Sequence, residues 1–452
     1  MIYGRPGKLR AFIAILPMAI AVAFAGCRAR DDGSACRAVD VTASLQRQID
    51  EAAAGGGGRV VVPPGRHGIH QLFLKSNVEL HLSAGAELVS LQTPAEATGT
   101  EKADSTWFLI GGEGLHNVSI TGRGRINGNG CAFWKKAPGV DYASDPLYGP
   151  QYGWIAGRPL GMVHFKNCRD VVLRDVELSD PPTYTVWLLG CDRGLVENVR
   201  ITTDMAGPNT DGLDIDCCSD VTVAGCDIRT GDDAVALKSS LHHLGREKPC
   251  ERITVRNCRL RSRWSGIRLG WEGDNPIRNC VFSNSVMISH IGISLLTVTA
   301  AQGNVLKGTP IRDVIFRDNE LDVGMVFQIR HGRVDGPQPP TGRMENVLVE
   351  NTVARARFGS YVAGFPDNPV RNLTIRNLTM TMADDPACDF SANGDWTPPK
   401  TDAFRVPKSY TLPYGLAFSC VEGLRLENYR MVTAHPEWWL KDVRNFDTEG
   451  TK

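Results

Sequence analysis

Short runs of alternating apolar and polar residues recur through most of this chain, and Gly, Asn or Asp bounds each run. From residue 160 onward the interval between runs is irregular, about 24 to 33 residues, which is the range of solenoid repeats. Alternation with period two predicts half-buried strands, and the small polar residues between them predict bends. The repeat is clearest in residues 170–175, 252–258, 311–316 and 370–375.

This pattern predicts an all-β, single-domain right-handed parallel β-helix, in which each coil buries its apolar row against its neighbours. Residues 44–54 have the spacing of a short amphipathic helix, which we expect to cover the open end of the first coil. The segment 384–413 is rich in Pro and Asp and predicts a loop. Strands resume over 414–429, and we expect the tail with Trp438 and Trp439 to cover the last coil. We therefore place the β-helix domain at residues 38–445. A sandwich or propeller is the competing all-β fold, but the recurring aromatic signature of a propeller is missing.

The N-terminus has the features of a signal peptide over residues 1–27. Lys8 and Arg10 precede an apolar run over residues 11–24, and small residues follow it. The string Phe24-Ala25-Gly26-Cys27 resembles a bacterial lipoprotein box, in which Cys27 is lipidated. We therefore expect an exported bacterial protein, periplasmic, secreted or held at the outer membrane by lipid on Cys27. No later stretch approaches the roughly twenty apolar residues of a membrane-spanning helix.

The charge and the cysteine content limit the kinds of binding partner that the sequence suggests. Lys plus Arg and Asp plus Glu number 50 each, so no basic excess points to nucleic acid. Among the 13 cysteines, several recur at one position of the repeat, which predicts an interior row of free thiols. The clearest are Cys168, Cys191, Cys226, Cys258 and Cys280. No Cys or His spacing suggests zinc, so we expect no metal, no cofactor and a monomer.

Three aspartates carry the candidate chemistry. They stand in the strings Asn209-Thr210-Asp211-Gly212 and Gly231-Asp232-Asp233, about one repeat apart. Residues on stacked coils lie about 4.8 Å apart, so Asp211 and Asp232 are expected to be neighbours. A bend after Gly231 must turn both Asp232 and Asp233 toward one cleft. Crowded carboxylates raise one another's pKa, which suits glycoside hydrolysis with one protonated and one ionised carboxyl group. A single such string is more often a plain turn.

The chain resembles the polygalacturonase family, glycoside hydrolase family 28, of the pectin-lyase-like superfamily. The resemblance rests on a series of motifs in order, which are Asp40-Val41-Thr42, Pro63-Pro64-Gly65, Asn117-Val118-Ser119-Ile120-Thr121-Gly122, Gly128-Asn129-Gly130, Arg158-Pro159, Trp187-Leu188-Leu189-Gly190-Cys191, Pro208-Asn209-Thr210-Asp211-Gly212 and Thr230-Gly231-Asp232-Asp233. It implies inverting hydrolysis, with Asp232 as the general acid and Asp211 and Asp233 as the pair that activates water. For inversion we expect the acid and the base to stand about 6.5–9.5 Å apart.

Two motifs of that family are missing. Where it has Gly-His-Gly, residues 263–272 of this chain contain no histidine. Where it has Arg-Ile-Lys, which grips a galacturonate carboxylate, residues 292–296 contain neither cation. A carboxylate subsite without Arg or Lys loses its charge-assisted hydrogen bonds. We therefore expect a decorated pectic or related glycan rather than plain polygalacturonate.

Other residues are candidates for the cleft. We expect Asn209, Asp214, Arg268, Trp271 and Arg330 to bind substrate. Arg268 would hold an acidic or hydroxylated sugar, although it would equally fit a solvated arginine paired with Glu272. Asp214 would otherwise be structural, and Trp271 would otherwise cover the edge of the solenoid.

Three functions stay open. The first is a glycosidase that cleaves a polysaccharide or oligosaccharide by acid/base hydrolysis. The second is a carbohydrate-binding β-helix without catalysis, which the missing histidine favours. The third is a polysaccharide lyase on the same fold, for which Arg268 is the nearby candidate base.

Overall fold

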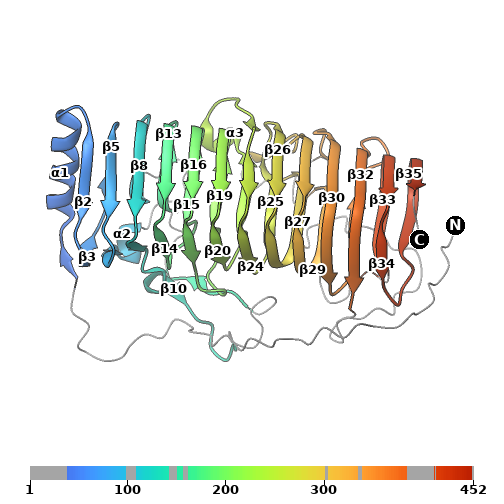
Figure 1. The fold of residues 1–452 in the computed structure, drawn as a ribbon, viewed down its shortest axis with the longest axis horizontal. Helices are drawn as coiled ribbons and strands as arrows, with labels where there is room; N and C mark the ends of the chain where they lie inside the picture. Colours follow the sequence, from blue (N-terminus) through green and yellow to red (C-terminus); the bar gives the residue numbers. More distant parts are fainter. Residues whose placement is uncertain are drawn as a thin grey trace.

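The coils of the chain stack in one row, from α1 (Thr42–Ala54) at one end to β35 (Trp438–Glu449) at the other (Figure 1). A computed structural model describes residues 38–97, 108–141, 150–155, 161–300, 304–333, 338–383, 412 and 414–449. Their strands pair in parallel with strands of the next coil, so the predicted right-handed parallel β-helix is confirmed. The predicted signal peptide with Cys27, and nearly all of the predicted loop over 384–413, lie outside the described residues.

Three faces make up each coil. The site face contains β4 (Leu72–Phe73), β7 (Phe108–Glu113), β12 (Gly161–Lys166), β15 (Val186–Leu189), β18 (Leu213–Asp216), β21 (Val235–Ser239), β25 (Ser265–Gly273) and β31 (Ser360–Ala363). The second face contains β2 (Gly58–Val62), β5 (Val78–Leu82), β8 (His116–Gly122), β13 (Arg169–Arg174), β16 (Asp192–Glu197), β19 (Ser219–Ala224), β22 (Cys250–Glu251), β23 (Thr254–Arg256), β26 (Ile277–Ser283) and β28 (Ile311–Arg317). The third face contains β1 (Val39–Asp40), β3 (Gly65–Ile69), β6 (Ala86–Ser90), β9 (Arg125–Asn127), β14 (Glu177–Ser179), β17 (Arg200–Thr202), β20 (Asp227–Thr230), β24 (Arg259–Ser262) and β34 (Arg430–Val432).

Later strands are longer and bend from one face to the next. They are β27 (Val286–Thr299), β29 (Glu320–Arg333), β30 (Met344–Ala356), β32 (Val370–Met382) and β33 (Leu416–Glu427). Smaller elements lie in the connections, namely α2 (Pro94–Ala97), η1 (Gly130–Phe133), α3 (Leu241–Leu244) and the antiparallel pair β10 (Trp134–Lys135) and β11 (Gly153–Trp154). Within the described ranges, no helix is long and apolar enough to cross a bilayer.

The ends of the apolar core are covered as the sequence predicts. Helix α1 buries Leu45 and Ile49 against the first coils, and it ends at Gly55. The helix begins two residues earlier than expected, where Thr42 donates its backbone N–H to the Asp40 carboxylate at 2.9 Å. At the other end Trp438 and Trp439 lie in β35, in register with β33.

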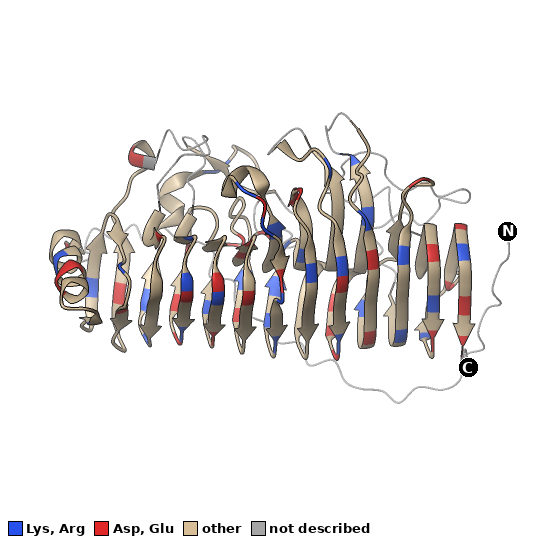
Figure 2. Cartoon of the chain, turned by 90° about the horizontal axis from the view of Figure 1, so that it is seen from above, with Lys and Arg blue, Asp and Glu red and all other residues tan. Residues whose placement is uncertain are grey.

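The bends and the core follow the repeat. Asn and Asp residues at the bends adopt positive φ, a conformation that these side chains tolerate better than most. Nine cysteines of the described coils are free and buried, among them all five of the predicted interior row. Cys131, in contrast, is disulfide-bonded. Basic and acidic residues are mixed along the strands, with neither sign dominating (Figure 2).

Candidate active site

Three carboxylates meet where two successive coils pass from the third face to the site face. Asp211 lies two residues before the start of β18, and Asp232 and Asp233 lie three and two residues before that of β21. The two bends are joined by the N–H of Gly212, which donates to the carbonyl of Asp233 at 2.9 Å. One oxygen of each carboxylate lies within 4.8 Å of those of the other two. The expected convergence is therefore present, although the nearest oxygens are closer than the expected 6.5–9.5 Å.

The bend at Gly231 is held from several sides. A Cβ on Gly231 would lie 2.5 Å from the carbonyl oxygen of Asp204, so the close approach of backbone requires glycine. The hydroxyls of Thr230 and Ser262 each donate to the carbonyl of Asp232 at 2.6 Å. The N–H of Asp233 donates to the carboxylate of Asp232 at 2.9 Å. These contacts turn two adjacent aspartates into the same cluster, against the alternation of a regular strand.

The three carboxylates differ in exposure. Asp211 is 2% exposed and Asp233 is 4% exposed, whereas Asp232 is partly exposed. Burial, and then the negative charge of Asp233, raise the pKa of Asp232 to about 7. Burial, and then Asp214 and Asp232, raise the pKa of Asp211 well above its usual range. The cluster therefore retains a proton near neutral pH, and Asp232 is the member that a ligand can reach.

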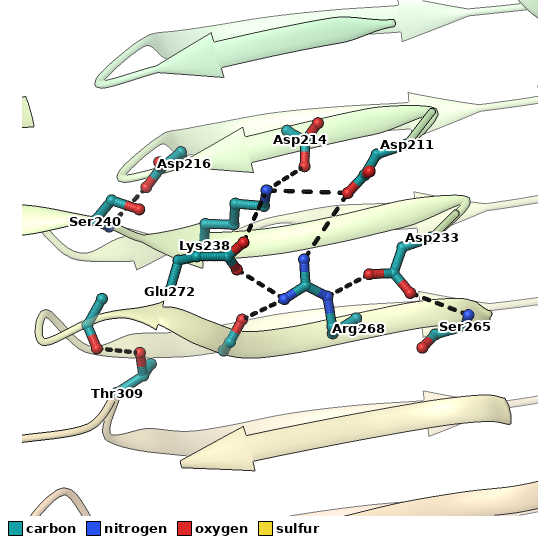
Figure 3. Close-up of polar contacts among 12 residues, drawn as sticks. Asp211, Asp214, Asp216, Asp233, Lys238, Ser240, Ser265, Arg268, Glu272 and Thr309 are labelled. Atoms are coloured by element: carbon teal, nitrogen blue, oxygen red, sulfur yellow. Dashed lines mark hydrogen bonds and ion pairs between the residues drawn. The ribbon is translucent and has the colours of Figure 1, made fainter. Parts of the chain in front are cut away.

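Two buried cations, Lys238 and Arg268, lie among the carboxylates of Asp211, Asp214 and Asp233 (Figure 3). Lys238 lies 2.9 Å from Asp214 and 3.9 Å from Asp211. Arg268 donates through Nε to Asp233, and its Nη2 lies 3.9 Å from Asp211. The N–H of Ser265 donates to the other oxygen of Asp233 at 3.0 Å. Asp211 thus faces both cations, while the Oδ1 atom of Asp211 has no hydrogen-bond partner.

Glu272 links the two cations. It lies 3.2 Å from Lys238 and 2.7 Å from Arg268. Burial alone would raise the pKa of Glu272, but Arg268 and Lys238 outweigh it and lower that pKa to about 2. Burial disfavours the charged forms of Lys238 and Arg268, but their carboxylate neighbours outweigh it and raise both pKa values well above the usual range. Both side chains are therefore held as cations.

The three aspartates have the proximity of a metal ligand set. The positive charges of Lys238 and Arg268, each 3.9 Å from Asp211, oppose the entry of a further cation. Hard cations such as calcium also require six or more oxygen ligands. The donor set present therefore fits proton chemistry better than metal binding.

The structure places the other predicted residues in several different environments. Asp214 is fully buried beside Lys238, so in this structure its carboxylate is not exposed to a ligand. Arg268 is paired with Glu272, as one interpretation expects, but it is buried rather than solvated and also pairs with Asp233. Trp271 follows in β25 with a positive φ of 70° and partial exposure. Arg330 is buried two coils farther along the site face, and Asn209 lies in the bend before Asp211 with positive φ.

Sequence reasoning missed Lys238. Its ammonium group lies 4.1 Å from the ring centroid of Tyr184, in cation–π range, as well as among the carboxylates. A signal was available, because Lys238 is the lone charge in the apolar strand β21, one coil beyond Asp214 and Asp216. In register it lies directly beside Asp216.

A short segment, residues 150–155, is tied to the wall of this site. Gln151 donates to the carbonyl of Gly231 at 3.1 Å, and the Tyr152 hydroxyl donates to Asp204 at 3.2 Å. Arg263 donates to the carbonyls of Pro150 and Met205, both at 3.1 Å. The bend that carries Asp232 is therefore supported from outside the coil as well as from within it.

Comparisons with known proteins identify the family of this chain. Residues 58–309, more than half of the chain, match the model of glycosyl hydrolases family 28. A probable polygalacturonase of Arabidopsis thaliana is 24% identical over 44% of this chain and 44% of its own length. A probable polygalacturonase of Vitis vinifera is 24% identical over 76% of this chain and 70% of its own length. The chain thus spans less than half of the first of these relatives.

A solved structure shows the same fold. The family 28 exopolygalacturonase of Yersinia enterocolitica superimposes with a TM-score of 0.70 and 17% identity, over 92% of this chain and 76% of that one. At this identity the likeness concerns the fold alone. The family match spans the three clustered aspartates and both buried cations. This chain is a member of glycosyl hydrolases family 28.

Proposed function

We propose that this protein is an exported glycosidase that hydrolyses O-glycosyl bonds in a pectin-type or related polysaccharide or oligosaccharide. Membership of the family supports a glycosidase in general terms. The observation that carries the finer proposal is the cluster of Asp211, Asp232 and Asp233, with carboxylate oxygens within 4.8 Å. Its accessible member has a pKa raised to about 7, as a proton donor at neutral pH requires.

Each aspartate has a distinct role in this proposal. Asp232 donates its proton to the glycosidic oxygen as the bond from that oxygen to the anomeric carbon breaks. A water molecule attacks the anomeric carbon, and its proton passes to Asp211 or Asp233. The free Oδ1 of Asp211 can accept a hydrogen bond from that water. Arg268 compensates the charge of Asp233 and holds its carboxylate in place.

The stereochemistry is proposed to be inverting. The short spacing of the carboxylates resembles that of retaining enzymes, in which one carboxylate attacks the sugar and the separation is about 5–5.5 Å. Asp211 and Asp233, however, are almost fully buried, and Asp233 is tied to Ser265 and Arg268. Such groups are reached by water more readily than by a pyranose ring. Proton NMR of the first product decides this point, since inversion gives the anomer opposite to that of the substrate linkage.

The sugar at the cleavage point is proposed to be uncharged. Both cations of the cluster, Lys238 and Arg268, are already paired with carboxylates of the chain. A uronate placed there would add a negative charge beside five carboxylates, namely Asp211, Asp214, Asp232, Asp233 and Glu272. We therefore expect faster release of reducing ends from a neutral or methyl-esterified glycan than from polygalacturonate.

The same ion pairs disfavour the lyase alternative. A lyase needs a group that abstracts a proton from the sugar, and Arg268 is the arginine beside the aspartates. Its pairing with Asp233 and Glu272 raises its pKa well above the usual range, so it does not give up a proton. Absorbance from an unsaturated product would contradict this part of the proposal.

Export and domain limits are further parts of the proposal. Lys8, Arg10 and the apolar run over residues 11–24 support a signal peptide over residues 1–27. Lipid on Cys27 would anchor the protein to a membrane, whereas cleavage without it would release a soluble enzyme. The described strands support a β-helix domain over about residues 38–445. Mass spectrometry of the N-terminal peptide from the mature protein distinguishes these fates.

Asp232→Asn tests the catalytic proposal directly. The amide cannot donate a proton as an acid does, so we expect a loss of about 10²- to 10⁴-fold in kcat with unchanged unfolding temperature. New reducing ends from a polysaccharide panel measure the activity. Asp318→Asn is the matched control, because Asp318 lies at a distant bend with φ of 57°, which asparagine also adopts. If Asp232→Asn keeps full activity, Asp232 is not the general acid. If the wild-type protein shows no turnover on any polysaccharide of the panel, the result favours the carbohydrate-binding alternative.

A further inference from the structure

Two arginines lie side by side on the third face, outside the cluster of catalytic aspartates. Arg229 in β20 is directly in register with Arg261 in β24. Neighbouring coils are about 4.8 Å apart, so the two strands carry like charges at adjacent positions. Both side chains are partly buried, and the Nε atom of each is buried without a hydrogen-bond partner.

No acidic residue compensates this pair in its own row. The next position in register on one side is Thr202, and on the other side it is Ile288. Among the described residues, neither guanidinium group forms an ion pair, in contrast to Arg252 and Arg278 on the second face, which pair with Asp220 and Glu251. Burial, and then Arg261, lower the pKa of Arg229, while Asp204 opposes that shift only in part.

Such a pair is unfavourable unless an anion binds it. Like charges directly opposite on neighbouring strands repel each other, and partial burial strengthens the repulsion. Exposed Arg200 and Arg259 lie in the adjacent row of the same strands and add positive charge, with Asp227 between them in register. Four arginines on three successive coils therefore outnumber the acidic residues near them, which are Asp227, Glu177 in register with Arg200, and Asp204 near Arg229.

The pair lies close to the candidate active site along the chain. Thr230 and Ser262 each follow one of these arginines, and both donate to the carbonyl of Asp232 at 2.6 Å. Three residues span at most about 11 Å of chain, so Arg229 lies within that distance of Asp232 measured between Cα atoms. A polymer that occupies the catalytic cluster can therefore reach around the bend to the third face.

We propose that Arg229 and Arg261 bind a carboxylate group of an acidic polysaccharide, at a site separate from the catalytic cluster. Planar guanidinium groups bind carboxylates through paired, charge-assisted hydrogen bonds. The choice of a polysaccharide rests on the proposed function, whereas the anion site rests on the two arginines alone. If the catalytic cluster accepts an uncharged sugar and the arginine pair binds uronates, the protein would select a polymer that contains both kinds of sugar.

The experiment measures binding without turnover, in the Asp232→Asn background. The probes are polygalacturonate and the same polymer with its carboxylates methyl-esterified. We expect Arg229→Gln/Arg261→Gln to weaken binding of polygalacturonate by about tenfold and to reduce its salt dependence, with binding of the esterified polymer unchanged. Arg355→Gln is the matched control, because Arg355 is an exposed arginine of the same face that lies opposite Asp322.

Two outcomes would overturn the proposal. One is unchanged binding of polygalacturonate, and the other is an equal loss for both polymers. The unfolding temperature of the double variant should not fall, because the substitutions remove a repulsion, and a marked fall would indicate a structural role instead. If the double variant does not fold, Arg261→Gln alone is judged by the same comparison. Because this experiment measures binding and not turnover, its failure would not contradict the proposed hydrolysis. Failure of the hydrolysis experiment would likewise not contradict the proposed anion site.

Discussion

Two rows of residues each occupy one position of successive coils, one at the bend between the second and third faces and one at the centre of the site face. Only the first row repeats its chemistry. In the turn ladder, formed by Asp318, Asn351, Asn377 and Asn428, each side chain has positive φ and bonds to the next. In the site row the residues in register are Trp187, Asp214, Ala236, Arg268 and Ser294. The ladder stabilises each bend locally, whereas the charges of the site row depend on partners from other coils.

Because of this difference, we expect substitutions in the two rows to destabilise the protein by different amounts. A ladder residue is exposed and has water as an alternative partner, so its contribution is mainly a preference of the backbone. A site residue is buried among charges, so removing one ion leaves its partners without compensation. Four predictions test this contrast, beginning with the largest expected effect.

Arg268→Ala should be the most damaging of these substitutions. It leaves Asp233 and Glu272 buried without their guanidinium partner, which we expect to cost about 3–5 kcal/mol of unfolding free energy. Arg376→Ala is the control, because Arg376 pairs with Glu350 at the surface, where such pairs contribute about 0–1 kcal/mol. Urea unfolding measures both. Equal losses would show that the buried network is no more important to stability than a surface pair.

The pH dependence of activity should follow Asp232 rather than an ordinary aspartate. With its pKa raised to about 7, Asp232 is protonated below that pH and ionised above it. The value of kcat/KM should therefore fall by about tenfold for each pH unit above 7, once the proton donor is lost. The folded state also binds more protons than the unfolded chain between about pH 4 and 7, so the contribution of Asp232 to stability is lost as pH rises through that window. A profile flat to pH 9 would contradict the assignment.

Asn351→Ala should affect the turn ladder alone. Asn351 has φ of 48° and is bonded to Asp318 at 2.9 Å and to Asn377 at 2.7 Å. Alanine is strained in this conformation by roughly 1–2 kcal/mol, whereas Asn351→Gly loses the side-chain bonds without that strain. We expect the alanine variant to be the less stable of the two, with kcat unchanged in both. A loss of kcat would connect the ladder to the site.

The same contrast explains what the sequence could predict. The ladder and the core arise from local preferences, so alternation and Asn or Asp at the bends were enough to predict the β-helix and its end caps. The convergence of Asp211 with Asp232 and Asp233 followed from the length of one coil. The pair of Arg268 with Glu272 was one of the interpretations, but the ion pairs of Lys238 and the pair of Arg268 with Asp233 did not follow, because they depend on register between coils. The lone charge of Lys238 in the apolar strand β21 was the one available signal, whereas Arg268 gave no pattern along the sequence that distinguishes a buried cation from an exposed one.

Asp214→Asn should be the mildest substitution within the site row, and it tests how that row tunes the acid and base. Asp214 is fully buried beside Lys238, and Lys238 keeps Glu272 as a partner when the charge of Asp214 is removed. We therefore expect the protein to fold and kcat at its optimum to change by less than about tenfold. Because Asp214 raises the pKa of Asp211, the substitution lowers that pKa, and Asp211 ionises at lower pH. The acidic limb of kcat/KM should shift to lower pH while the limb above pH 7 keeps its position. A shift of both limbs together would mean that Asp214 acts on Asp232 as well, and complete loss of activity would mean that it contacts the substrate after all.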